Sequence, residues 1–305
     1  MSNTIQILGS IILATIPALA WGLLFYLKRP EDRRLSVLTF LAGGLAVAPI
    51  LLYKLSWDYI PWLNAFKFAE NYQNDLLGMG SIVTIPLSVI ITFMFVGVIE
   101  EVMKYFAVKS VDSNKLLTVD DAIEFFIIAA LGFSFTENIL YFYNIWLAEG
   151  AAHLFIPFLF RSGFSTFAHI MFSGIFGYYY GVAHFAKPIL QEEIKANRRH
   201  WTIWFHKTLS IRKIRLFHEE KIAEGFLLAV GLHAIFNIFL EINATFLTVP
   251  FLVGGYITLT YLFSKKNNHK KYGKLLEGSR NHSANPHKNY FHSLRKLIDR
   301  RDLQN

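Results

Sequence analysis

Residues 81–108 read SIVTIPLSVIITFMFVGVIEEVMKYFAV, and this stretch decides the class of fold. Its length and apolar character are those of a transmembrane helix, since about 20 helical residues cross the hydrocarbon of a bilayer. The same stretch contains Glu100, Glu101 and Lys104. Ionisable side chains at membrane depth are energetically costly, so they usually pair with one another or form a functional site. The stretch therefore predicts a membrane-spanning helix that carries a polar site.

Apolar stretches of similar length recur along the 305 residues, of which 53% are hydrophobic. They predict an all-α membrane protein, a polytopic bundle of about seven transmembrane helices. The first stretch is interpreted as a retained span and not as a cleaved signal peptide, because no basic residue precedes it. The predicted spans are residues 5–27, 35–53, 81–108, 121–146, 154–186, 221–242 and 245–263.

The distribution of charge predicts how the chain is organised. The formal net charge is +8, and the whole excess lies in residues 264–305. A basic segment that follows the last span is typical of a membrane protein, so we expect contact with anionic lipid head groups and no nucleic-acid partner. The chain should thus consist of a transmembrane core, residues 1–263, with a basic cytoplasmic loop at 187–220, and a largely disordered basic cytoplasmic tail, residues 264–305.

Orientation follows from the connections between spans. Nearly all Lys and Arg outside the spans lie in alternate segments, namely 28–34, 109–120, 187–220 and the tail. The positive-inside rule places these segments in the cytoplasm, with the N-terminus outside. The chain contains no cysteine, which excludes thiolate metal sites and a cysteine nucleophile.

Polar residues recur in four consecutive spans, which predicts a single site between them. Residues four positions apart share one face of a helix, and this spacing relates Glu100 to Lys104, and His233 to Asn237. We therefore expect Glu100 to pair with Lys104 and Glu101 to lack a partner on its own helix. The remaining polar residues at membrane depth are Glu137 and Asn138 in the fourth span and Arg161 and His169 in the fifth.

Two of these residues are expected to be peripheral to the site. Arg161 lies near the outer end of its span, so its side chain should extend towards the membrane surface in a structural role. The predicted span ends place Glu137 roughly 12 Å from Glu100 along the membrane normal, at a rise of 1.5 Å per residue. Glu137 is therefore expected to support the site from a distance.

The composition of the predicted site suits hydrolysis of a peptide bond. That reaction needs a base to activate water and donors to stabilise the oxyanion, roles that Glu and His or Asn can fill. Two His and one or two Glu also suit a zinc site, although the H-E-x-x-H signature is absent. A third interpretation is a transporter, in which the same charges line a substrate path, or a non-enzymatic scaffold.

Four ordered motifs resemble those of the PrsW family of intramembrane proteases, within the superfamily of the type II CAAX prenyl endopeptidases. Residues 100–104, EEVMK, are similar to the family's E-E-x-x-K motif, and 132–141, GFSFTENILY, to its G-F-x-x-x-E-N-I-L-Y segment. Arg161 to His169, followed by Gly174, Gly177 and Gly181, resembles its third motif, and residues 233–237, HAIFN, its fourth. The chain departs from the pattern at Ser165, where the superfamily often has Phe, and at Asn237, where relatives can carry Asp.

The resemblance implies a glutamic-type intramembrane endopeptidase without an obligatory metal or other cofactor. Glu100 would activate water with help from Glu101, while His169, His233 and Asn237 would position the water and hold the oxyanion. Lys104, Glu137, Asn138 and Arg161 would be supporting residues. The implied partner is a single-pass membrane protein substrate, such as an anti-sigma factor, in the bacterial plasma membrane.

Overall fold

A computed structural model describes residues 3–26, 33–78, 84–112, 116, 118–195 and 212–265. Residues 1–262 form one compact unit, and the structure describes the second unit, Phe263–Asn305, only as far as Lys265. The predicted disorder of the tail lies outside the described residues. The helices are α1 (Asn3–Tyr26), α2 (Arg33–Leu45), α3 (Val47–Ser56), α4 (Phe66–Glu70), α5 (Leu87–Asp112), α6 (Val119–Glu149), α7 (Phe155–Phe160), α8 (Thr166–His184), α9 (Ala186–Lys195), α11 (Lys213–Glu241) and α12 (Thr245–Lys265).

The predicted all-α membrane fold is confirmed. Within the described residues, six helical segments are long and apolar enough to cross a bilayer: Asn3–Leu23, Arg33–Ser56, Val119–Glu149, Ala151–His184, Lys213–Glu241 and Thr245–Leu262. The remaining predicted span corresponds to α5, which carries three charged residues, Glu100, Glu101 and Lys104, within its apolar stretch. The count of about seven is therefore approximate. A short antiparallel hairpin, β1 (Leu76–Gly78) and β2 (Thr84–Pro86), leads directly into α5.

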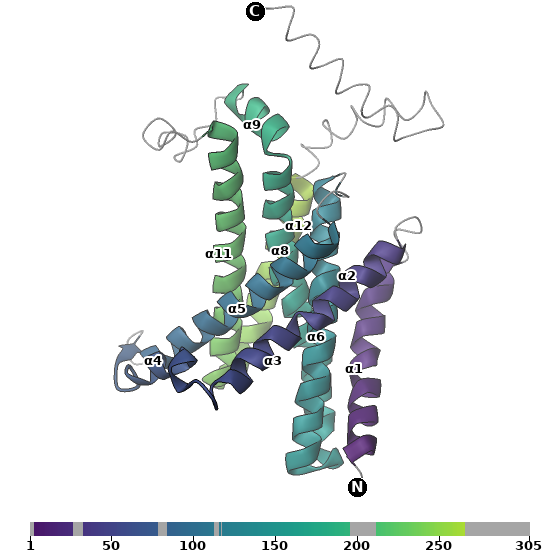
Figure 1. The fold of residues 1–305 in the computed structure, drawn as a ribbon, viewed down its shortest axis with the longest axis vertical. Helices are drawn as coiled ribbons and strands as arrows, with labels where there is room; N and C mark the ends of the chain where they lie inside the picture. The colour runs from purple at the N-terminus through teal and green to yellow at the C-terminus, as the bar shows by residue number, and fades with distance from the viewer. Residues whose placement is uncertain are drawn as a thin grey trace, which may run out of the picture. The chain divides into compact units, whose positions relative to one another are not determined.

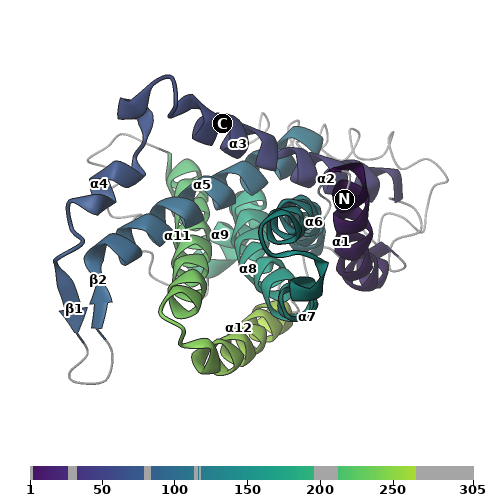
Figure 2. The same ribbon diagram turned by 90° about the horizontal axis from the view of Figure 1, so that it is seen from below.

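The six spans and α5 alternate in direction along the chain (Figure 1). The end of α5 and the starts of α2, α6 and α11 consequently lie at the same end of the bundle. Helix α6 packs against α1, α2 and α8, and α8 packs in turn against α11. Figures 1 and 2 show that α5 crosses the bundle obliquely, and it packs against α2 and α11.

Local sequence signals explain the boundaries of α6, the most buried of the spans. Thr118 precedes the helix, and its side chain accepts a hydrogen bond from the Asp121 backbone N–H (3.2 Å) while the Asp121 carboxylate accepts one from Thr118 N–H (2.8 Å). This reciprocal capping box satisfies backbone donors that the first helical turn leaves free. The helix ends at Glu149, and the φ of 90° at the next residue, Gly150, favours glycine.

Close packing of α6 against α2 requires glycine on both helices. A Cβ added at Gly132 would collide with the backbone carbonyl of Phe40, and one at Gly43 would collide with that of Ala129. Small residues allow such close backbone contact between membrane helices, where van der Waals packing drives association. This contact holds α6, and with it Glu137 and Asn138, at a defined position in the bundle.

We expect Gly132→Ala to destabilise the protein strongly, because the colliding group is backbone and cannot move aside alone. Overpacking typically costs about 1–3 kcal/mol, and this site should reach or exceed the top of that range. Thermal unfolding of the detergent-purified protein measures the effect. Gly231→Ala on α11 is the matched control, since a Cβ there meets no atom within 4 Å. Equal stability of the two variants would contradict the packing argument.

Candidate active site

The centre of the candidate site is a charged cluster on α5. Lys104 Nζ donates a hydrogen bond to Glu101 Oε1 (2.7 Å) and lies 3.8 Å from Glu100 Oε2. The Lys104 and Glu101 side chains are fully buried, whereas 14% of the Glu100 side chain is exposed. The prediction that Glu101 lacks a partner on its own helix is thus wrong. Residues three and four apart both lie on one helix face, and Lys104 approaches the i,i+3 carboxylate more closely.

His233 on α11 connects the two carboxylates. Its Nδ1 lies 3.1 Å from Glu101 Oε1, and its Nε2 lies 3.6 Å from Glu100 Oε2. A carboxylate in this ion pair can only accept a hydrogen bond. His233 Nδ1 therefore carries the ring proton and donates a hydrogen bond to Glu101. Phe172 stacks on the imidazole at a centroid distance of 5.3 Å, which keeps the ring in this orientation.

His169 on α8 joins this cluster to a second polar group. Its Nδ1 lies 3.0 Å from Lys104 Nζ and its Nε2 lies 3.0 Å from Glu137 Oε2. An ammonium group has no acceptor, so Nδ1 must accept the hydrogen bond from Lys104. The ring proton of neutral His169 is then on Nε2, which donates a hydrogen bond to Glu137. The arrangement selects one neutral tautomer of His169.

The second polar group surrounds Arg161. Its guanidinium forms an ion pair with Glu137 (2.8 Å) and donates a hydrogen bond from Nε to Asn138 Oδ1. The guanidinium also lies 4.5 Å from the ring centroid of Tyr141. The predicted orientation of Arg161 towards the membrane surface is therefore wrong. Three partners on α6 hold the side chain inside the bundle, where an unpaired charge would be costly.

A π-helical turn, η3 (Arg161–Ser165), helps to place Arg161. Thr166 Oγ1 donates to the Arg161 carbonyl (2.9 Å), a spacing of five residues that an α-helical pattern does not reveal. Such turns often occur at functional sites. Sequence reasoning missed Thr166 for this reason, and it missed Ser134, which contacts both Thr166 (3.1 Å) and Asn138 (3.5 Å). Ser134 lies four residues before Asn138, and this spacing, which puts both residues on one face of the helix, could have predicted their contact.

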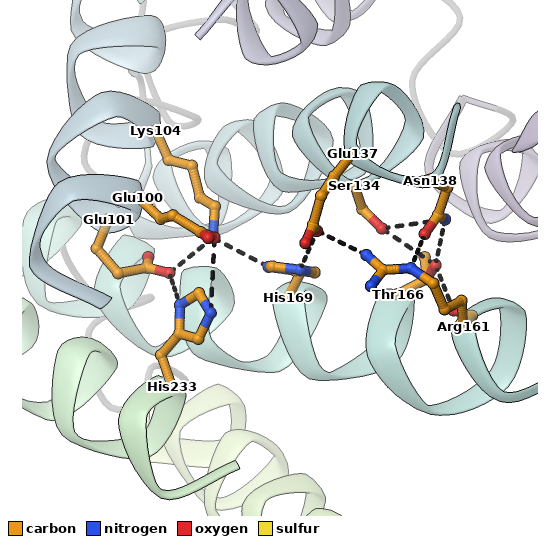
Figure 3. A network of polar contacts seen from close by, with 10 residues as sticks. All are labelled: Glu100, Glu101, Lys104, Ser134, Glu137, Asn138, Arg161, Thr166, His169 and His233. Carbon is orange, nitrogen blue, oxygen red and sulfur yellow. Dashed lines mark hydrogen bonds and ion pairs between the residues drawn. The ribbon is translucent and has the colours of Figure 1, made fainter. Parts of the chain in front are cut away.

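A cavity of about 160 Å³ lies beside both groups and receives side chains from α5, α6, α8 and α11. Figure 3 shows the polar chain that runs along it, from Glu101 and Lys104 through His169 and Glu137 to Arg161. Glu101 and Lys104 do not line the cavity and are buried behind it. The polar residues that line it are Glu100, Glu137, Tyr141, Arg161, Ser165, His169, His233 and Asn237.

The structure thus brings the predicted catalytic and supporting residues into one connected region. Glu137 lines the same cavity as Glu100, despite the separation expected from the span ends. Helix α5 crosses the bundle obliquely (Figure 1), so span ends counted along the membrane normal do not give the distance between its side chains and those of α6. Asn237 lies one turn after His233 on α11 and faces the same cavity.

Three of these residues form a group that could hold a metal ion. One ligand atom each from Glu100, His169 and His233 lie within 4.8 Å of one another. A carboxylate oxygen and two imidazole nitrogens are common zinc ligands. Lys104 lies against the same group, with its ammonium 3.0 Å from His169 Nδ1.

Comparison with known proteins identifies the family. The profile described as PrsW family intramembrane metalloprotease matches residues 31–263, which include all four motifs and every residue that lines the cavity. No curated protein and no solved structure matches the chain. The family match covers more than two thirds of the sequence, and the membrane-spanning fold agrees with it. The chain therefore belongs to the PrsW family of intramembrane proteases.

Proposed function

We propose that this protein is a glutamic-type intramembrane endopeptidase that cleaves a membrane-anchored protein with water activated by Glu100. Membership of a protease family supports peptide hydrolysis as the reaction. The enclosed polar cavity supports a site within the membrane, because it holds two carboxylates, two imidazoles and an amide among otherwise apolar helices. Water and one backbone carbonyl of the substrate would meet in this cavity.

The observation that carries the assignment is the contrast between the two adjacent glutamates. Glu101 is fully buried behind the cavity, and its Oε1 is bound by Lys104 and His233, while its Oε2 makes no hydrogen bond to any described residue and does not line the cavity. Glu100 lines the cavity, and its Oε2 makes no hydrogen bond to any described residue. A carboxylate that lines the cavity can approach the reacting atoms, which is what a general base requires and what Glu101 cannot do. Glu101 then assists by orienting His233 and by pairing with Lys104.

The proposed reaction uses residues of the chain alone. Glu100 takes a proton from water, and the water oxygen attacks the carbonyl carbon of the substrate. The amide of Asn237 donates to the resulting oxyanion. The carbon–nitrogen bond then breaks, and the proton passes from Glu100 to the leaving amine. His233 Nε2, 3.6 Å from Glu100 Oε2, can share this proton during the transfer.

His169 has a positioning role in this proposal. Both of its ring nitrogens are occupied, one by Lys104 and the other by Glu137. It therefore links the charged cluster on α5 to the Arg161 group and fixes part of the wall of the cavity. Arg161 and Asn138 support it through Glu137, which gives each of the predicted supporting residues a physical connection to the site.

A metal-dependent mechanism is the second candidate, favoured by the family description and by the close approach of Glu100, His169 and His233. These three residues fit zinc in donor type and would hold it, and a bound zinc would supply an activated water. We rank it second because the Lys104 ammonium already donates to His169 and neutralises the carboxylates. A cation next to this ammonium would experience strong repulsion at low dielectric.

Treatment with chelators distinguishes the two mechanisms. Purified protein in detergent is incubated with peptides prepared from bacterial membranes, and mass spectrometry identifies newly formed termini. We expect cleavage to persist after treatment with EDTA and phenanthroline, with a change in cleavage rate below about twofold. Removal of a catalytic metal would lower the rate far more. Loss of cleavage that zinc restores would establish the second candidate instead. Proton-coupled uptake into proteoliposomes without any cleavage would support a transporter. Absence of both cleavage and uptake would support a non-enzymatic scaffold.

Localisation follows from the same proposal. We place the protein in the bacterial plasma membrane with the N-terminus outside and the C-terminus in the cytoplasm. The alternating direction of the helices brings the end of α5 and the starts of α2, α6 and α11, which border basic segments, to one end of the bundle, in agreement with the positive-inside rule. The basic loop at 187–220 and the tail would contact anionic head groups. The proposed substrate is a single-pass membrane protein, with an anti-sigma factor as the candidate that the family resemblance suggests.

A further inference from the structure

A second cavity adjoins Glu100 on the side away from α8. It has a volume of about 350 Å³ and lies between α3, α4 and α5. Glu100 lines this cavity as well as the polar one. Apart from Glu100 and Lys54, its lining is aromatic and aliphatic, formed by Ile50, Tyr53, Trp57, Phe66, Val96 and Ile99. The carboxylate that we assign as the base therefore lies between a polar chamber and an apolar one.

The aromatic wall of this apolar cavity is held in place by specific contacts. Tyr53 donates a hydrogen bond from its hydroxyl to the Leu63 carbonyl (2.8 Å) and accepts one from the Ala65 N–H (3.2 Å). Trp57 packs edge-on against Tyr53 and Phe66, at centroid distances of 5.4 and 5.3 Å. These bonds tie α3 to the segment that follows it. The cavity is thus a built feature with fixed walls, as binding pockets usually are.

Trp57 also carries an unsatisfied donor. Its indole Nε1 is buried and makes no hydrogen bond to any described residue. Buried donors without a partner are uncommon, because each loses its hydrogen bond to water. This nitrogen has almost no accessible surface, so the choice of occupant rests on Glu100: the proposed base lines the same cavity, which favours the substrate polypeptide over a lipid.

We propose that the apolar cavity is a specificity pocket that accepts a bulky apolar side chain of the substrate polypeptide, close to the scissile bond. The inference rests on the proposed function and specifies the substrate class for it. Ligand pockets span roughly 300–1,000 Å³, so this volume lies at the lower end of that range and is large enough for one bulky side chain. Because an extended chain advances about 3.3–3.6 Å per residue and Glu100 borders both cavities, the recognised residue lies within about two positions of the cut.

The variant Val96→Phe fills the pocket, and Val96→Ala enlarges it. The matched control is Val98→Phe, which adds the same side chain to the same helix at a position that is 36% exposed and does not line the cavity. The probe is the peptide mixture from bacterial membranes. New termini that require Glu100 are identified by comparison with the Glu100→Gln variant. Size-exclusion profiles in detergent show whether each variant is folded.

For the wild type we expect Phe, Leu, Ile or Met to be enriched at one position beside the cut. Val96→Phe should shift that position to Gly, Ala or Ser and lower kcat/KM for bulky substrates about tenfold or more, within the range that pocket shape can impose. Val96→Ala should shift the preference at that position towards larger residues. It tests the pocket independently if Val96→Phe does not fold. Val98→Phe should leave the profile unchanged.

The outcomes separate this inference from the proposed function. Cleavage that depends on Glu100 but shows no preference for bulky residues, or a preference that neither Val96 variant alters, overturns the specificity pocket and leaves the protease standing. The specificity pocket is also overturned if Val96→Phe lowers kcat/KM equally for all peptides and Val96→Ala leaves the residue preference beside the cut unchanged. That result favours a lipid or structural role for the cavity. Absence of any cleavage that requires Glu100 overturns the proposed function, and the inference with it.

Discussion

Glu100→Gln is expected to lower kcat about 10²–10⁴-fold, the contribution typical of a positioned general base. The amide has nearly the same shape as the carboxylate but cannot take a proton from water. Glu100 lines the polar cavity and its Oε2 makes no hydrogen bond to any described residue, and Lys104 keeps its closer ion pair with Glu101, so the substitution removes the base without breaking a hydrogen bond. The thermal unfolding midpoint should therefore change little.

The measurement is the rate at which purified variants release fragments from the membrane peptides. Glu149→Gln is the matched control, because it makes the same chemical change on an exposed residue at the end of α6. Undiminished cleavage by a folded Glu100→Gln variant would contradict the proposed mechanism. Cleavage that is instead lost in Glu101→Gln, with normal stability, would move the role of the base to the neighbouring residue.

Lys104→Met should have the largest effect on stability. The ammonium is fully buried, donates to Glu101 at 2.7 Å and lies 3.0 Å from His169 Nδ1. Its removal leaves the buried Glu101 carboxylate without a cation, and breaking a buried ion pair on one side costs about 3–5 kcal/mol. We expect a much lower unfolding midpoint and loss of cleavage, because His169 and Glu101 both lose the contact that positions them.

The double variant Glu101→Gln/Lys104→Met tests this reasoning. It removes both charges, so it should be more stable than Lys104→Met alone, as expected when a charged pair is replaced as a unit. Thermal unfolding in detergent provides the comparison. Lys109→Met is the control, since this lysine lies on the same helix but is exposed. If the double variant is no more stable than the single one, Lys104 does not act through Glu101.

Much of the fold could be predicted from the sequence, because the lipid environment simplifies the pattern. A segment that crosses the hydrocarbon must satisfy its backbone internally, so each long apolar stretch reads as a helix. The predicted span 245–263 agrees closely with α12 (Thr245–Lys265), and the predicted span 221–242 ends next to the end of α11 at Glu241, although α11 begins earlier, at Lys213. Only α5 is not among the six apolar segments, because Glu100, Glu101 and Lys104 place three charged residues within its apolar stretch, and these are the residues that make it functionally important.

The pairing of the charged residues could not be predicted from helical spacing. Lys104 is adjacent to both Glu100 and Glu101, and the choice depends on which side of α5 faces His169 and His233. Arg161 presented the same difficulty, since a position near the end of a span permits an orientation towards either water or the bundle. Its partners are on α6, and the π-helical turn that presents it has no signature in the apolar pattern.

The sequence by itself determined that this is a helical membrane protein, that its polar residues lie on four consecutive spans, and that Glu100, Glu101, His169, His233 and Asn237 are the residues to examine. These conclusions depend on composition and on spacing along single helices. Only the tertiary structure decided that Glu100 borders two cavities while Glu101 is buried behind them, and that Glu137 and Arg161 reach the site. Such relations depend on the tilt and rotation of whole helices, which are set by contacts such as that between Gly132 and Phe40.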